Sequence, residues 1–157
     1  MVIAMDGPQC ACGSRGCLEA LASGSAIGRM GREAAAQEAG ARILRHTGGE
    51  KNAVTGAHVA MAAAEGDPKA QAILSSATRA LGIGVANVMN ALGPELIVLG
   101  GGVVAKNGDR FVSSVAETAR AGALPGCSVP VVRAALGERS GALGALALAR
   151  DEMKSGH

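Results

Sequence analysis

The sequence predicts an α/β protein in which Ala- and Gly-rich helices pack on a mainly parallel sheet. Residues 95–99 and 129–132 are short aliphatic runs, and each is followed by a pattern typical of a helix. Residues 68–92 add an apolar stripe that recurs at three- and four-residue steps, as in a long core helix. These three segments indicate strands covered by helices.

The composition predicts one domain and excludes several kinds of partner. The chain has 157 residues, a net charge of +2, 24 glycines, one Phe and neither Tyr nor Trp. Scattered basic residues and almost no aromatic side chains argue against binding to nucleic acid. Uncharged apolar stretches such as GALGALALA are about half of the roughly 20 residues that a membrane span needs, so we expect no membrane partner.

Two helices are predicted in the first third of the chain, over residues 17–29 and 32–46. Both are rich in Ala, Leu, Arg and Glu, and we expect them to be divided near Gly28 and Gly31, because each glycine lowers helix propensity by about 1 kcal/mol. The sequence His46-Thr47-Gly48-Gly49 should end the second helix.

Capping residues define the next two helices. Thr55 can cap a short helix that runs through Glu65. Asp67 is placed as the N-cap of the long helix over 68–92, with Pro68 in its first position and a break at Gly93-Pro94.

The remaining segments predict two α/β units. Residues 95–99 are apolar on both faces, which favours a buried parallel strand, and Gly100 to Gly102 close it. A helix over 109–121, a strand over 129–132 and a final helix from Ser140 should follow. A glycine turn after a parallel strand lets a ligand approach the backbone, so Gly101 and Gly102 are candidate nucleotide-binding residues, although such turns are common without a ligand.

Three cysteines lie within eight residues, at Cys10, Cys12 and Cys17, with Gly13 and Gly16 between them. Thiolates at this spacing suit zinc, whereas a disulfide across one intervening residue would be strained. Buried free thiols and, in a secreted protein, disulfides are the alternatives. The start of the chain has no secretory pattern, so we expect a reducing cytoplasm.

Four segments in order resemble the carboxyl-terminal part of ROK-family sugar kinases, especially bacterial glucokinases. They are CACGSRGCLEALASGSAI, GDPKAQAIL, LGIGVANVMNALGPELIVLGGGV and SGALGALALA. The resemblance implies an actin-like (ribonuclease H-like) lobe that is incomplete at its amino terminus. It divides the chain into residues 1–16, a strand remnant at Val2–Met5 with a zinc loop; residues 17–92, a helical part; and residues 93–157, a nucleotide-side α/β part.

The resemblance also implies the roles of individual residues. Cys10, Cys12 and Cys17 would bind a structural zinc ion, Glu19 would accept hydrogen bonds from sugar hydroxyls, and Gly101 and Gly102 would lie beside the adenosine of ATP, which is used with Mg²⁺. The family's fourth zinc ligand, a histidine, would precede Met1. A water molecule could take the place of this fourth ligand, or one of four side chains of the chain could, namely His46, His58, Cys127 and His157.

The implied function is that of an ATP-dependent hexose kinase in carbohydrate metabolism, with the choice of sugar left open. We expect the chain alone to be inactive, because the family's phosphate loop and catalytic base lie outside it, and to form a homo-oligomer, because absent strands leave sheet edges open. The alternatives are the effector-binding lobe of a ROK-family sugar-responsive repressor and a free-standing zinc module.

Overall fold

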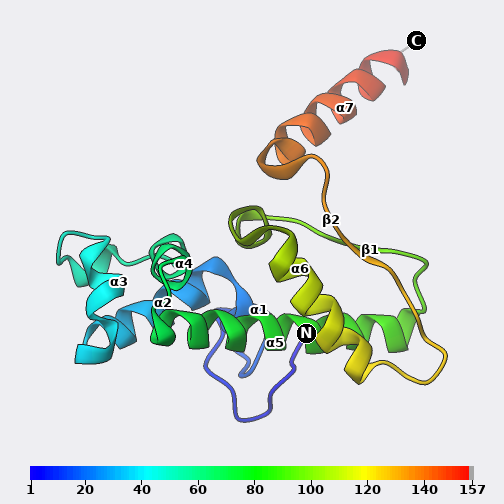
Figure 1. The fold of residues 1–157 in the computed structure, drawn as a ribbon. Coiled ribbons are helices and arrows are strands. Elements are labelled where there is room, and N and C mark those ends of the chain that lie inside the picture. The colour runs from blue at the N-terminus through cyan, green and yellow to red at the C-terminus, as the bar shows by residue number, and fades with distance from the viewer. Residues whose placement is uncertain (156–157) are drawn as a thin grey trace.

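The computed structural model describes residues 1–155 and is mostly helical, with one small sheet (Figure 1). The helices are α1 (Leu18–Ala22), α2 (Gly24–Ala35), α3 (Ala41–Arg45), α4 (Gly56–Ala64), α5 (Pro68–Leu92), α6 (Gly102–Gly122) and α7 (Ser140–Ser155). Short 3-10 turns are η1 (Glu38–Gly40), η2 (Lys51–Ala53) and η3 (Gly137–Arg139), and the strands are β1 (Ile97–Leu99) and β2 (Val131–Arg133).

Helix α5 is the central element, and its predicted ends are confirmed. The buried Asp67 side chain accepts a hydrogen bond from the Ala70 amide at 2.6 Å, Pro68 is the first helical residue, and Gly93 ends the helix with φ 55°. One part of α5 packs with α1, α2 and α4, and another part packs with α6. Although α5 is long and apolar enough to span a membrane, these contacts are those of a core helix.

The predicted helix boundary at Gly28 and Gly31 is wrong, because both glycines lie inside α2. The chain breaks instead at Ser23, whose hydroxyl accepts a hydrogen bond from the Ala26 amide at 3.1 Å. A Cβ at Gly31 would lie 2.5 Å from a Val59 methyl group, so this glycine allows α2 to pack closely on α4.

The predicted single helix over 32–46 is also wrong. Helix α2 ends at Ala35, and the chain turns back through η1 before α3 begins at Ala41. A Cβ at Gly40 would lie 2.3 Å from the Ala34 carbonyl, so the turn brings two backbone segments into direct contact. The following predicted helix from Thr55 is confirmed as α4.

The α/β part has the predicted order of strand, helix, strand and helix, but its sheet is smaller than expected. Strand β1 pairs in parallel with β2, with Ile97 opposite Val131. In the described residues the sheet contains only these two strands, so β1 is not covered on both sides and Val98 is 55% exposed. The expected strand remnant at Val2–Met5 is reduced to one antiparallel bridge between Val2 and Cys17.

The two helices of the α/β part also differ from the expectation. Helix α6 starts at Gly102 rather than at residue 109, with a kink at Gly108 (φ 69°, ψ −161°). It packs along α5, where a Cβ at Gly82 would meet Thr118 at 2.4 Å. The final helix does start at Ser140, but α7 lies away from the sheet (Figure 1), and its contacts are mainly with η3, the turn directly before it.

Candidate functional site

The cysteine loop is folded by backbone hydrogen bonds around two glycines with positive φ. The Cys10 amide donates to the Ser14 carbonyl at 2.8 Å, and the Gly13 amide donates to the Cys10 carbonyl at 3.0 Å. Gly13 has φ 90° and Gly16 has φ 66°, a region that other residues rarely adopt. These turns fold the loop back on itself, so that cysteines separated by up to seven positions come together.

The structure brings the three predicted cysteine side chains into one cluster. All three Sγ atoms lie within 4.8 Å of one another, and those of Cys12 and Cys17 are 3.6 Å apart. Cys10 and Cys17 are buried, whereas Cys12 is exposed. Zinc holds sulfur at about 2.3 Å in a tetrahedron, which places its sulfur ligands about 3.8 Å apart. The donor set and its spacing therefore fit a thiolate metal such as zinc.

The close sulfurs shift each other's ionisation in opposite directions. The backbone hydrogen bond from Ser14, aided by the sulfurs of Cys10 and Cys17, lowers the pKa of the Cys12 thiol to about 7. The pKa of the Cys17 thiol is raised to about 11, first by its hydrogen bond to Cys12 and then by burial. One thiolate thus forms near neutral pH while its neighbour keeps a proton that an incoming metal would displace.

These opposite shifts predict different alkylation profiles in the metal-free chain. The thiolate is the nucleophile, so the rate at which iodoacetamide modifies Cys12 should rise as the pH increases and level off above about 7. The rate at Cys17 should keep rising beyond pH 9. Mass spectrometry of quenched samples measures both rates. A Cys12→Ser variant should lose the phase near pH 7, and the prediction fails if both cysteines follow one profile.

The structure brings none of the described substitutes for a fourth ligand into the sulfur cluster. Among the described side chains, the cysteine triad is the only group of three or more His, Cys, Asp or Glu residues that could hold a metal ion. His46 lies 3.4 Å from Glu65 through its Nε2 atom, and the Nδ1 atom of His58 accepts a hydrogen bond from the Thr55 amide at 3.1 Å. Cys127 lies beside the Met89 carbonyl at 3.8 Å. His157 is outside the described residues.

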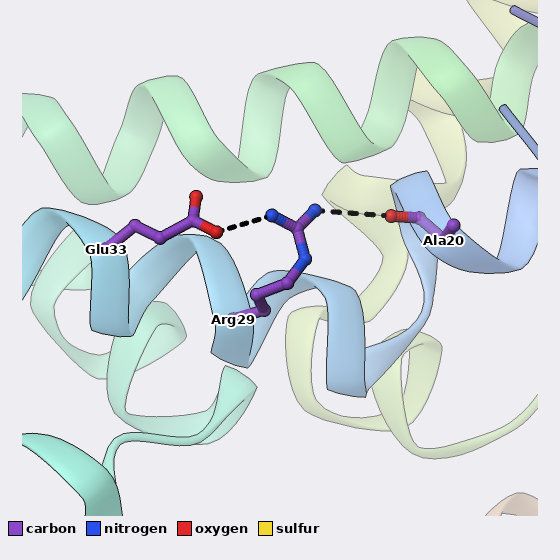
Figure 2. Close-up of polar contacts among 3 residues, drawn as sticks. All are labelled: Ala20, Arg29 and Glu33. Atoms are coloured by element: carbon purple, nitrogen blue, oxygen red, sulfur yellow. Dashed lines mark hydrogen bonds and ion pairs between the residues drawn. The ribbon is translucent and has the colours of Figure 1, made fainter. Parts of the chain in front are cut away.

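Glu19 lies in the first turn of α1, directly after the cysteine loop. Its side chain is exposed and has no hydrogen bond or ion pair within the described chain, so both carboxylate oxygens are available to a ligand. Helix α1 is held by Arg29 of α2, as Figure 2 shows. The guanidinium donates to the Ala20 carbonyl at 3.5 Å and to Glu33 at 2.6 Å, which ties the helix that bears Glu19 to α2.

A cavity of about 400 Å³ lies where three helices begin. Its lining includes the first residue of each helix, Gly24 of α2, Gly56 of α4 and Gly102 of α6. Helix N-termini carry partial positive charge and unpaired amides, and residues without side chains allow a ligand to reach them. Gly101, with φ 91°, is the N-cap of α6 and precedes this lining.

Sequence reasoning singled out Gly102, which lines this cavity, but missed the other lining residues. These residues are Gly24, Ile27, Thr55, Gly56, Ala57, Val103, Lys106 and Asn107. The pairs Ser23-Gly24 and Thr55-Gly56 were a usable signal, since each combines a capping residue with an accessible first turn. Their meeting at one place depends on tertiary packing.

The fold and the cysteine loop correspond to a defined class of proteins. Residues 1–152 match the model of the ROK family, and the chain belongs to that family. It is 32% identical to the glucokinase of Streptomyces coelicolor over 151 residues, which are 93% of this chain and 47% of that protein. The chain thus spans about half the length of the curated relatives it matches.

Solved structures show the same relationship. A ROK family glucokinase from Streptomyces griseus, in complex with glucose and AMPPNP, superposes with a TM-score of 0.83 and 32% identity, over 96% of this chain and 50% of that one. A ROK family transcriptional regulator, a homologue of the E. coli MLC protein, gives a TM-score of 0.61 and 30% identity, over 85% of this chain and 33% of that one.

Proposed function

We propose that this chain is the sugar- and nucleotide-binding lobe of an ATP-dependent hexose kinase of the glucokinase type. The observation that carries the proposal is the sulfur cluster next to α1, which presents the unpaired carboxylate of Glu19 in a lobe that superposes on a glucokinase crystallised with glucose and AMPPNP. Because the chain spans half of its relatives, the reaction of the whole protein is part of the proposal.

On the nucleotide side, the proposed ligand is Mg²⁺-ATP in the cavity beside Gly102. The three converging helix N-termini supply amide donors and positive potential to an anionic or polar ligand. Lys106 adds a cationic side chain to the same lining. Gly101 and Gly102 leave the backbone accessible there, which is the role proposed for both residues.

On the sugar side, the proposed ligand of Glu19 is a pair of sugar hydroxyls. A carboxylate accepts hydrogen bonds through both oxygens, and charge-assisted bonds of this kind are stronger than neutral ones. Zinc bound by Cys10, Cys12 and Cys17 would fix the loop that leads into α1, so its role is structural. Zinc would thereby hold the position of Glu19 without contacting the reacting atoms.

The second candidate is the effector-binding lobe of a ROK-family repressor. The likeness to the ROK transcriptional regulator supports it, since that structure shares the fold with this chain at 30% identity. The glucokinase superposes more closely and over more of the chain, which favours the kinase. A repressor lobe would bind sugar but would have no use for the nucleotide cavity.

A chimera tests the kinase proposal directly. This chain would replace the matched half of the Streptomyces coelicolor glucokinase, and ADP formation would be measured with glucose and other hexoses in a coupled assay. The expected result is glucose-dependent ADP formation that falls by about a hundredfold or more in kcat/KM on Glu19→Gln, because the variant loses charge-assisted hydrogen bonds. Glu95→Gln, which changes an acidic residue next to β1, is the matched control and should leave kcat/KM unchanged.

Nucleotide binding to the chain alone covers the case in which the chimera does not fold. Titration with Mg²⁺-AMPPNP should shift the amide NMR signals of Gly24, Gly56 and Gly102. The kinase proposal is wrong if a folded chimera forms no ADP, or if the chain binds glucose but these three signals do not respond to nucleotide. The second outcome would favour the repressor lobe.

A further inference from the structure

A second, larger cavity adjoins the proposed nucleotide cavity and extends beyond it. It occupies about 1060 Å³ and is lined by residues of α4, α5 and α6. Helices α5 and α6 run in the same direction and touch where Gly82 faces Thr118 and Gly122 faces Ala86. Towards their amino ends they separate (Figure 1), and the cavity fills this wedge.

The walls of the cavity combine an apolar floor with a cationic rim. Met61 of α4, Leu74 of α5 and Phe111 of α6 supply the floor. Arg79 of α5 and two residues of α6, Lys106 and Arg110, supply the positive charge, and Glu117 is the only acidic residue in the described lining. Hydroxyl-bearing residues of both helices also line the cavity, namely Ser75, Thr78, Ser114 and Thr118.

The three cations have no partner in the described chain. None of them takes part in a hydrogen bond or an ion pair within residues 1–155, although other surface charges do, such as Arg29 with Glu33. Three like charges around one cavity repel each other, and an anion placed among them would remove this repulsion. A ligand that is only charged would leave the floor in contact with water, so the complementary ligand also has an apolar body.

We propose that the groove between α4, α5 and α6 is a binding site for a small organic anion, with a phosphate or carboxylate group attached to an apolar body. The anionic group would lie among Arg79, Lys106 and Arg110, and the apolar body would cover Leu74 and Phe111. The groove shares Ala57, Lys106 and Asn107 with the cavity at the helix N-termini and continues along α6 beyond the kink at Gly108, as far as Thr118. The site does not depend on the proposed kinase function.

The test uses 2-naphthyl phosphate as the probe, because it joins a phosphate to an apolar ring system. Titration of the isotope-labelled chain should shift the amide NMR signals of Thr78, Phe111 and Ser114 in a saturable way. Calorimetry should show that inorganic phosphate and 2-naphthol each bind at least about tenfold more weakly than the probe, because each offers half of the interaction.

Charge variants complete the test. Arg79→Gln together with Arg110→Gln should weaken probe binding about fivefold to tenfold, and added salt should weaken wild-type binding in the same direction. The control pair is Lys69→Gln with Arg120→Gln, which removes two exposed charges from the same helices outside the cavity lining and should change affinity less than about twofold.

Several results would overturn the proposal. These are the absence of saturable binding, shifts confined to α7 or to Gly24, Gly56 and Gly102, an equal loss of affinity in the control pair, or inorganic phosphate binding as tightly as the probe. The last result would reduce the groove to a nonspecific positive surface.

Discussion

Replacing Cys17 with serine is expected to abolish stable zinc binding. The wild-type chain should retain about one zinc ion after desalting, and the Cys17→Ser variant should retain none. A serine hydroxyl is a poor substitute for thiolate, and each thiolate carries a large share of the roughly 10 to 16 kcal/mol with which four-ligand structural zinc sites bind. With three sulfurs in the cluster, the loss of one should weaken zinc binding by at least about a hundredfold. Metal analysis by mass spectrometry gives the stoichiometry.

Cys127 provides the matched control for this experiment. It is the one cysteine outside the cluster, and its Sγ atom lies 3.8 Å from the Met89 carbonyl of α5. Cys127→Ser should therefore retain about one zinc ion. If Cys17→Ser kept its zinc, or if both variants lost it, the cluster would not be the metal site.

Replacing Gly16 with alanine is expected to be the most damaging single-methyl change in the cysteine loop. The added Cβ would lie 1.5 Å from the Ala4 carbonyl oxygen, at a residue with φ 66°, so the loop must open. Opening would break the bonds from the Ile3 and Ala4 amides to the Gly16 carbonyl and from the Gly16 amide to the Pro8 carbonyl. At about 1 kcal/mol each, these three bonds amount to about 3 kcal/mol, which lowers Tm by about 6 to 12 °C.

Gly13→Ala separates the steric effect from the effect of backbone conformation. Gly13 also has a positive φ, 90°, but nothing lies within 4 Å of its Cβ position. This variant should lose only about 1 to 2 kcal/mol, the cost of left-handed backbone for a residue with a Cβ. Thermal unfolding followed by circular dichroism compares the two. Equal losses of Tm would show that contact with Ala4 does not hold the loop.

The parts of the fold that follow from local chemistry could be predicted from the sequence. The Asp67-Pro68 start and the Gly93 end of α5 are set by capping and by backbone preference, and both were confirmed. Gly28 and Gly31 misled the prediction, because glycine in a helix weakens it locally but also permits close packing. Whether packing outweighs propensity depends on α4, which lies far along the chain.

In the candidate site, too, local residues could be predicted from the sequence, whereas contacts between distant segments could not. Cys10, Cys12 and Cys17 lie in one loop, so their spacing predicted the cluster that the structure contains. The cavity at Gly102 joins residues up to 83 positions apart, from Gly24 to Asn107, and no local pattern connects them. The size of the sheet was also beyond local reasoning, since the pattern of residues 95–99 describes a strand covered on both sides, whereas Val98 is exposed here.

The two-stranded sheet has a consequence for how this lobe can associate. Main-chain amides and carbonyls along the outer sides of β1 and β2 can accept a further strand, whatever its side chains. A peptide segment with modest sequence requirements can therefore widen the sheet and cover Val98 at the same time. Such pairing would depend on backbone geometry, so it would tolerate sequence change far better than the arrangement of the three sulfurs does.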